Sequence, residues 1–311
     1  MSILKLISTT LYMGEDEIKR FIDQSPHRYK VYKIAKRNSD QKRTIAQPSK
    51  ELKFIQRLVM NEYFRDLPVH PCAQAYVEGK GIKLNARAHL GSSFLLKMDF
   101  KDFFPSIKPE AFLAYLQENG FDFDESDREC IERIFFWRPR NSPGLLLSIG
   151  APSSPRISNL VMFTFDVKVE DYCKEKGITY TRYADDLTFT TNEQGVLFSI
   201  PDFIESVCSQ IQYPELTINS EKTVFSSKKH NRHVTGLVLT NDNKISIGRD
   251  KKRKIRALVH RYINGFLEEH DINRLKGYLA YIHDVEPEFI NSLQAKYGSH
   301  VIYSIKHYGV E

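Results

Sequence analysis

The amino-acid sequence predicts an α+β fold, in which helices and short antiparallel strands are mixed along the chain. Apolar residues recur at helical spacing in several segments, and β-prone runs flank the pair Asp185–Asp186 in "TRYADDLTFT". Strands and helices do not alternate regularly, which argues against a doubly wound parallel sheet. The 311 residues suffice for one large domain or two to three small ones with a real core.

The composition is that of an ordinary folded protein, with 41% hydrophobic and 27% charged residues. We find no apolar run of membrane-spanning length and no secretory cleavage pattern near the N-terminus, so we expect a cytoplasmic protein without a membrane partner. The cysteines are far apart and form no C-x-x-C pair, which argues against a zinc ribbon and fits a reducing compartment. They are Cys72, Cys130, Cys173 and Cys208.

The first third of the chain alternates between helical and extended patterns. We expect a first helix at the N-terminus, a short amphipathic helix over 15–24 and a longer one over 50–67. Between them, 29–49 reads as two strands joined by a basic, polar turn.

The remainder begins with an apolar strand in 92–107 that runs into acidic and aromatic residues. A helical stretch is expected to about residue 137, and a long helix from about residue 150 to a stop at Gly177. After the hairpin come a helix near 200–212, a strand pair in 216–227 and 232–239, and a basic helical tail from Arg249.

Asp185 and Asp186 form an unusual hairpin turn. Two-residue turns favour glycine because their central residues need positive φ, and adjacent carboxylates repel each other. A divalent cation reverses that cost, and Asp99, at the end of the apolar run 94–98, supplies a third carboxylate. Three such groups can hold two ions roughly 3.5–4 Å apart for in-line phosphoryl transfer. The alternative is a solvated surface turn and an unrelated strand-end cap.

The segment Tyr183–Asp186 resembles the Y-x-D-D hairpin of reverse transcriptases. Other blocks resemble motifs of that family in the same order, and the similarity spans about residues 28–240. They are the fingers motif (42–59), motif A (97–107), motif B (150–159), motif D (218–223) and the primer grip (233–237).

Two shorter strings resemble diagnostic elements of bacterial retron reverse transcriptases. These are "NARAH", Asn85–His89, and "VTG", Val234–Gly236. The resemblance implies a right-hand polymerase with fingers, palm and helical thumb. The expected bounds are 1–94 for the fingers, 95–245 for the palm with a fingers-like insertion at about 119–148, and 246–311 for the thumb.

The resemblance also implies the metal site. Asp99, Asp185 and Asp186 would be catalytic and would bind two Mg²⁺ ions, for which Mn²⁺ is a possible substitute. The carbonyl of Phe100 would complete one coordination shell.

The resemblance further implies a nucleotide site. Lys36 and Arg43 would clamp the triphosphate, for which the alternative is a solvated basic hairpin. Phe104 would be a steric gate against the 2′-hydroxyl, or else one of two core rings in "DFFP".

Backbone N–H groups of Asp102 and Phe103 would face the triphosphate, and Gly150 would allow close backbone approach. Lys222 would neutralise or protonate the leaving pyrophosphate, or else be a strand-edge lysine. Ile149 stands where the family usually has glutamine, and it cannot hydrogen-bond the nucleotide or template.

Contacts with RNA or primer are expected at the two diagnostic strings and at the basic tail. Asn85 and His89 share a helix face; the resemblance implies that they contact RNA or orient the fingers, and the alternative is a structural hydrogen bond. The tail has six basic residues in eight, which suits a phosphate backbone, or else forms a solvated face. The full set of expected contacts is Asn85, His89, Val234, Thr235, Gly236, Lys251, Lys252, Arg253, Lys254 and Arg256.

A retron enzyme would use its own structured noncoding RNA as primer and template, with dNTPs as substrates. Its product would be a single-stranded DNA branched from a guanosine 2′-hydroxyl of that RNA. The resemblance also implies an accessory effector protein and anti-phage defence. The alternatives are another bacterial reverse transcriptase, of group II intron or abortive-infection type, and a noncatalytic RNA-binding protein.

Overall fold

The computed structural model describes residues 2–35, 42–140 and 142–309, so Lys36 lies outside the described residues. The chain forms two compact units, each built from separate stretches of sequence. Unit 1 comprises Met1–Gly79, Leu96–Phe189 and Gly195–Val224, and unit 2 comprises Lys80–Leu95, Thr190–Gln194 and Phe225–Glu311. The polymerase subdomain bounds expected from the sequence stay a prediction, because compactness alone does not define fingers, palm or thumb.

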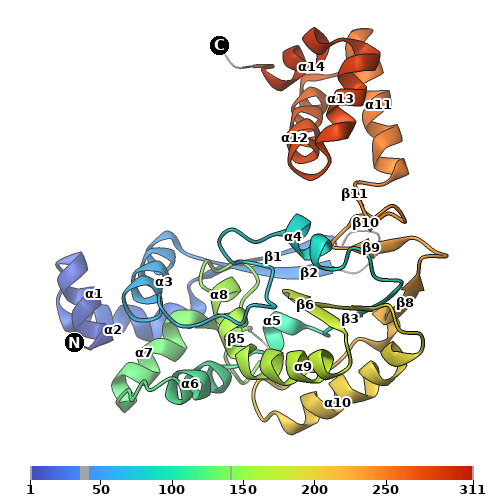
Figure 1. The fold of residues 1–311 in the computed structure, drawn as a ribbon. Coiled ribbons are helices and arrows are strands. Elements are labelled where there is room, and N and C mark those ends of the chain that lie inside the picture. The colour runs from blue at the N-terminus through green and yellow to red at the C-terminus, as the bar shows by residue number, and fades with distance from the viewer. Residues whose placement is uncertain (1, 36–41, 141, 310–311) are drawn as a thin grey trace. The chain divides into compact units, whose positions relative to one another are not determined.

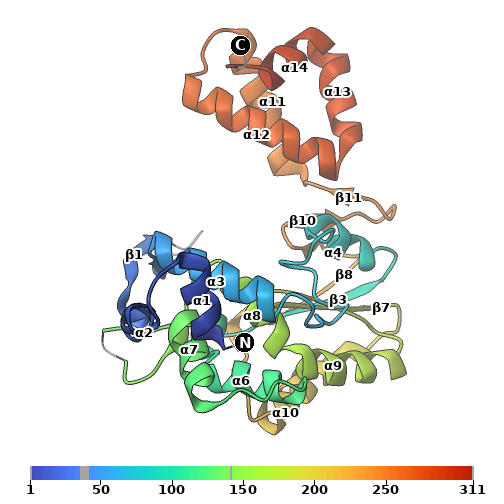
Figure 2. The ribbon, with the colours of Figure 1, turned by 90° about the vertical axis from the view of Figure 1, so that its left-hand side faces the viewer.

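Helices and strands are mixed as the sequence predicts, and the α+β class is confirmed (Figure 1). The N-terminal part of unit 1 contains α1 (Ile3–Leu11), α2 (Glu15–Gln24), β1 (Tyr29–Ala35), β2 (Lys42–Pro48), α3 (Lys50–Tyr63), α6 (Pro109–Glu118), α7 (Glu125–Phe135), β4 (Phe136–Trp137) and β5 (Leu146–Leu147). Strands β1 and β2 pair antiparallel, with Arg43 opposite Ile34. Helices α1, α2, α3 and α7 lie together (Figure 2).

Helix α3 illustrates how the sequence sets an element. The Ser49 hydroxyl caps it by accepting a hydrogen bond from the Leu52 N–H at 3.3 Å. Leu52, Ile55 and Val59 recur at helical spacing, and all three are buried. The helix ends beside Phe64, whose ring meets the Phe112 ring edge to face at 5.3 Å.

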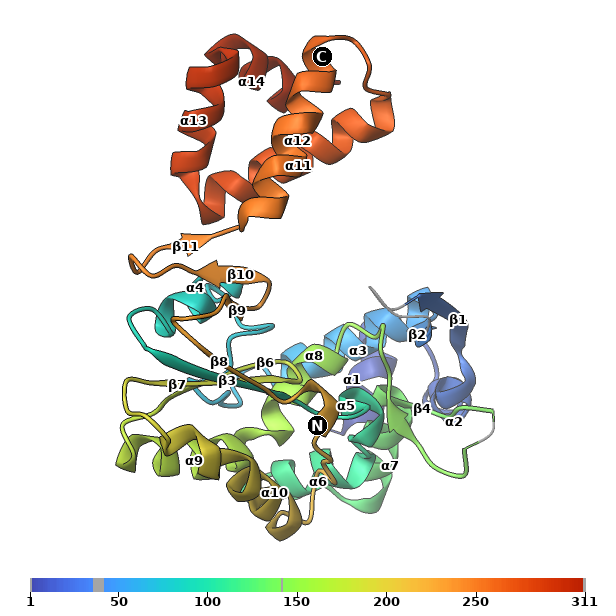
Figure 3. The same cartoon turned by 90° about the vertical axis from the view of Figure 1, so that its right-hand side faces the viewer.

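The four-stranded sheet carries the hairpin. Its strand order is β6 (Thr179–Tyr183), β7 (Asp186–Thr191), β3 (Phe94–Asp99) and β8 (Val224–Ser227). Helices α9 (Phe163–Glu175) and α10 (Ile200–Gln210) pack together on one face of this sheet (Figure 3). The order places the end of β3 next to the start of β7, which brings Asp99 to the hairpin.

Two sequence-based expectations about elements were wrong. The helix expected from residue 150 is two helices, α8 (Ser154–Val161) and α9, with a break at Met162, where ψ is 0°. Strand β8 neighbours β3, whereas β9 (Arg232–Val234) pairs with β10 (Leu237–Leu239). The two strands expected as a pair therefore belong to different sheets.

Unit 2 is built around one apolar core. It contains α4 (Ile82–Ala88), β9, β10, β11 (Ile245–Ser246), α11 (Arg249–Ile263), α12 (Glu269–Val285), α13 (Pro287–Tyr297) and α14 (Ser299–Lys306). Ala86 of α4, Leu237 of β10 and Leu279 of α12 all belong to this core and are fully buried. The expected basic helix from Arg249 is confirmed as α11. Within the described residues, no helix combines the length and apolarity needed to cross a bilayer.

Candidate active site

The hairpin turn between β6 and β7 has a strained backbone. Ala184 has φ 57°, whereas Asp185 is not among the residues with positive φ. Positive φ at a central turn residue favours glycine, which has no Cβ, so alanine is unusual here. Arg182 donates from Nη1 to the Ala184 carbonyl at 3.2 Å. The turn therefore holds an unfavourable conformation with the help of a neighbouring side chain.

Three carboxylates converge at this turn, as the sequence predicts. One oxygen from each of Asp99, Asp185 and Asp186 lies within 4.8 Å of the others. Asp99 is buried at the end of β3, and its Oδ1 accepts a hydrogen bond from Lys222 Nζ at 2.8 Å. Carboxylate oxygens are the ligands that hard divalent cations prefer, so this group could bind a metal ion.

Burial and neighbouring charges raise the pKa of the two aspartates at the turn, Asp185 and Asp186. Burial and the charges of Asp185 and Asp99 raise the pKa of Asp186 from 3.8 to about 7. Burial and Asp99 also raise the pKa of Asp185, and Lys222 and Arg43 oppose that rise. Ionising these carboxylates together therefore costs free energy in the folded protein. A bound divalent cation would offset that cost.

The segment after Asp99 presents one aromatic ring toward the outside. Phe103 is buried and stacks on Phe100 at 5.7 Å, whereas Phe104 is partly exposed. The Phe104 ring also meets that of Phe103 edge to face at 5.5 Å, so the gate and the core-packing alternative for Phe104 both stay predictions. Asp102, which begins the short helix α5 (Phe103–Ser106), has φ 43° and is exposed.

Motif A is joined to the motif D segment through the backbone. The Lys101 N–H donates to the Thr217 carbonyl at 2.8 Å, and the Asn219 N–H donates to the Asp99 carbonyl at 2.7 Å. These bonds hold the segment that carries Lys222 beside Asp99. Lys222 ends the short 3-10 turn Ser220–Lys222 and is ion-paired with Asp99 at 2.8 Å, and its role toward pyrophosphate stays a prediction.

Gly150 and Ile149 lie against β2. Gly150 has φ 130°, and an added Cβ would lie 3.0 Å from the Ala46 carbonyl oxygen and 3.1 Å from Ile45. The Ile149 carbonyl accepts a hydrogen bond from the Ala46 N–H at 2.9 Å. Glycine is required here by the positive φ and by close approach to β2, a role that the sequence does not reveal.

Asn85 and His89 are both fully buried in unit 2. His89 Nδ1 is 2.8 Å from Thr190 Oγ1, and burial lowers the pKa of His89 to about 3, so its ring is neutral. The His89 contact matches the alternative of a structural hydrogen bond, and neither buried side chain offers surface for RNA in this conformation.

The "VTG" string forms the turn between β9 and β10. Thr235 and Gly236 have φ 47° and 77°, the pattern of a type I′ turn. Thr235 Oγ1 donates to the Ile82 carbonyl at 3.2 Å, and Lys251 Nζ donates to the Gly236 carbonyl at 3.2 Å. Val234 is buried, so only the turn residues are available to a partner.

The basic residues of α11 divide into two groups. Lys251 and Lys252 are half-buried and have partners within the protein. Lys251 donates to the Gly236 carbonyl, and Lys252 forms an ion pair with Glu286. Arg253, Lys254 and Arg256 are exposed. The exposed group is the part of the tail that can face phosphates.

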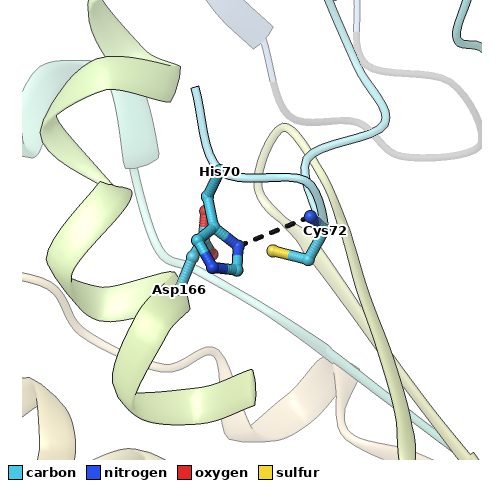
Figure 4. Close-up of side chains that lie close together, drawn as sticks. All are labelled: His70, Cys72 and Asp166. Atoms are coloured by element: carbon cyan, nitrogen blue, oxygen red, sulfur yellow. Dashed lines mark hydrogen bonds between the residues drawn. The ribbon is translucent and has the colours of Figure 1, made fainter. Parts of the chain in front are cut away.

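A second group of ligand-type side chains lies inside unit 1. His70, Cys72 and Asp166 are buried with ligand atoms within 4.8 Å of one another (Figure 4). His70 Nδ1 accepts from the Cys72 N–H at 3.4 Å, and burial raises the pKa of the Cys72 thiol well above 9.0. Asp166 already accepts hydrogen bonds from Arg182 and Tyr180. A neutral thiol and an occupied carboxylate make this group a poor metal site.

Two residues near the carboxylates were missed by sequence reasoning. Arg182 lies in β6, two residues before Ala184 of the turn, and is fully buried. Tyr76, with φ 60°, has its ring 6.5 Å from that of Phe104, and partial burial and the charge of Asp185 raise its pKa. A charge inside a β-prone run was a usable signal for Arg182, whereas nothing local marked Tyr76.

A carboxylate cluster at a hairpin of a four-stranded sheet is the arrangement expected of polymerases that transfer nucleotides with two metal ions. Residues 34–239 match the family described as reverse transcriptase (RNA-dependent DNA polymerase). The Escherichia coli proteins "Retron Ec83 reverse transcriptase" and "Retron Ec73 reverse transcriptase" are similar to this chain. The first is 42% identical over 97% of both chains, and the second is 36% identical over 96% of this chain and 95% of its own.

A solved structure of apo telomerase from Candida tropicalis is 14% identical, with a TM-score of 0.50, and covers 86% of this chain and 57% of that one. This likeness shows the fold alone. The chain belongs to the reverse transcriptase family, and within it to the bacterial retron reverse transcriptases. It is an RNA-directed DNA polymerase with the right-hand fold, so the resemblance stated from the sequence is confirmed.

Proposed function

We propose that Asp99, Asp185 and Asp186 bind two Mg²⁺ ions and catalyse nucleotidyl transfer. The donor set fits the ions, because three carboxylates meet within 4.8 Å, and burial together with the charges of Asp185 and Asp99 raises the pKa of Asp186. This convergence is the observation that carries the proposal. The bound ions would activate the attacking hydroxyl and neutralise charge on the leaving group, and Mn²⁺ would be a substitute. The Phe100 carbonyl is proposed as a further ligand.

Lys222 has the position of a charge-balancing group. Its ammonium donates to Asp99 at 2.8 Å, and the Lys222 side chain is more than half exposed, so it can move from Asp99 to a pyrophosphate oxygen. There it would neutralise or protonate the leaving group. Its release from Asp99 would also free that carboxylate for the metal.

Nucleotide selection is assigned to groups around the carboxylates. Phe104 would exclude a 2′-hydroxyl, since its ring is partly exposed while that of Phe103 is packed in the core. Arg43 acts electrostatically on Asp185 and Tyr76, which supports a place for it near the triphosphate. Lys36, the N–H groups of Asp102 and Phe103, and Gly150 complete the proposed nucleotide site.

The nucleic-acid partner is proposed to be the protein's own structured noncoding RNA, which serves as primer and template with dNTPs as substrates. Similarity to retron enzymes over nearly the whole chain supports this partner. The product would be a single-stranded DNA branched from a guanosine 2′-hydroxyl. The proposed RNA contacts are the Thr235–Gly236 turn and the exposed basic side chains of α11. Asn85 and His89 are proposed to orient α4 from the interior. A role in anti-phage defence with an accessory effector protein is proposed from the resemblance.

The test uses purified protein and RNA transcribed from the DNA beside its gene. With Mg²⁺ and dNTPs we expect DNA that stays joined to RNA after ribonuclease treatment and is released by a 2′–5′ debranching enzyme. Asp185→Asn should abolish all synthesis, whereas Asp171→Asn on the exposed surface of α9 should not. DNA extended only from an added primer would reject the branched product, and full activity of the Asp185 variant would reject the metal site.

A further inference from the structure

Arg182 lies inside unit 1, next to the turn that presents Asp185 and Asp186. We propose that Arg182 is a positioning residue for the polymerase reaction. Its side chain fixes the Ala184 carbonyl, and with it the turn that carries two of the candidate metal ligands. This inference rests on the proposed metal site.

The guanidinium is held by a fork of hydrogen bonds. Its Nε donates to Asp166 Oδ1 at 2.9 Å and its Nη2 donates to Oδ2 at 2.6 Å, with both side chains fully buried. The remaining nitrogen, Nη1, donates to Asn159 Oδ1 at 3.1 Å and to the Ala184 carbonyl at 3.2 Å. A planar fork can make these contacts together, and a lysine ammonium cannot.

The acceptors of this fork are themselves fixed. Asp166 Oδ1 also accepts from the Tyr180 hydroxyl at 2.9 Å, so α9 is tied to β6. Asn159 of α8 donates from Nδ2 to the Ala75 carbonyl at 2.8 Å, which sets its amide orientation. The oxygen of Asn159 is thereby directed to Arg182.

The backbone of Arg182 is held as firmly as its side chain. Its N–H donates to the Cys72 carbonyl at 3.0 Å, and its carbonyl accepts from the Gln74 N–H at 2.8 Å. The buried group of His70, Cys72 and Asp166 in Figure 4 thus belongs to the packing around Arg182. The backbone and the guanidinium of Arg182 are therefore both held by hydrogen bonds, as is needed for a residue that fixes a neighbouring turn.

The turn needs such support. Ala184 is buried and has φ 57°, a conformation in which glycine would carry no steric cost. Its carbonyl would lack this bond if the guanidinium moved, and buried carbonyls require partners. A buried ion pair is weak evidence of stability by itself, because desolvation offsets the attraction. The donation to the turn gives Arg182 a function that an ordinary ion pair would lack.

The experiment measures Mn²⁺ binding to the nucleic-acid-free protein by electron paramagnetic resonance, together with steady-state kinetics. Arg182→Lys keeps the charge near Asp166 and loses the fork. We expect Mn²⁺ affinity to fall about tenfold or more, as for other residues that orient metal ligands, and kcat to fall while KM for dNTP stays unchanged. Ala184→Gly in the Arg182→Lys protein should recover part of both losses, because glycine holds the turn without support.

The matched control is Arg156→Lys. Arg156 also uses its guanidinium on backbone carbonyls, those of Phe64 at 3.0 Å and Leu67 at 3.1 Å, and among the described residues its hydrogen bonds do not reach the hairpin. The Arg156→Lys substitution should lower the thermal stability of the protein and leave its Mn²⁺ affinity unchanged. Asp186→Asn reports on the metal site itself and should abolish strong Mn²⁺ binding.

The outcomes separate the two proposals. If Arg182→Lys binds Mn²⁺ as the wild type does while Asp186→Asn does not, the positioning role is wrong and the metal site stands. If the glycine substitution recovers nothing, Arg182 acts only in the core, and the positioning role is again wrong. If the wild-type protein binds no Mn²⁺, the proposed metal site fails.

Discussion

Replacing Asp186 by asparagine should stabilise the metal-free protein while removing its activity. Burial and two neighbouring carboxylates raise the pKa of Asp186 from 3.8 to about 7, so ionising it costs free energy in the folded state. A rise of about 3 units corresponds to about 4 kcal/mol. Because the side chain is more than a third exposed, solvent screening reduces the expected gain to about 1–2 kcal/mol.

The pH dependence of this gain has a definite sign. Below about pH 4 the carboxyl is protonated in folded and unfolded chains alike, so the substitution changes little. The wild type then loses stability as pH rises toward 7, and the benefit of asparagine grows and levels off above it. Saturating Mg²⁺ reverses the order, because only the wild type gains about 2.7 kcal/mol at 100 times Kd.

Scanning calorimetry with EDTA, and again with Mg²⁺, measures the effect. At about pH 8 without metal, Tm of Asp186→Asn should exceed that of the wild type by about 2–6 °C. Asp171→Asn, which removes an exposed carboxylate of α9, is the control for the effect on Tm of losing any surface carboxylate. A gain that is equal at pH 4 and pH 8, or a loss of stability without metal, would refute the electrostatic reasoning.

Three further substitutions test other parts of the site. Phe104→Ala should raise ribonucleotide use relative to deoxynucleotide use by about 10-fold or more in single-turnover assays, and unchanged selectivity would reject the gate. Lys222→Ala should lower kcat by about 100-fold or more with little change in KM for dNTP, whereas a rise in KM alone would assign it to binding. Replacing Arg253 and Lys254 by alanine should weaken RNA binding and reduce its salt slope by about 2; filter-binding curves that keep their slope would exclude phosphate contacts.

The carboxylate cluster could be predicted because its signals are local. Asp185–Asp186 makes a poor turn, and Asp99 interrupts an apolar run, so each residue is out of place in its own segment. Their convergence follows from strand order, which places β3 beside β7. Family resemblance added the motif order but was not needed to suspect a cation.

Other parts of the site depend on tertiary contacts that no local pattern encodes. Arg182 and Asp166 are 16 residues apart and meet only because α9 packs under β6. Gly150 reads as a nucleotide-facing glycine, yet it is constrained by the Ala46 carbonyl of a distant strand. No glycine or proline marks the break at Met162. The one proline of α8 and α9, Pro155, lies at the start of α8.

The shared core of unit 2 determines where this polymerase can be cut and recombined. Val234, Leu258 and Ile302 pack in one interior with Ala86, from four separate elements. A chimera that exchanges residues 246–311 for those of another retron enzyme would divide this interior and leave unmatched apolar surfaces on both sides. A transplant of RNA preference should therefore carry 80–95, 190–194 and 225–311 together, three stretches of sequence that behave as one building block.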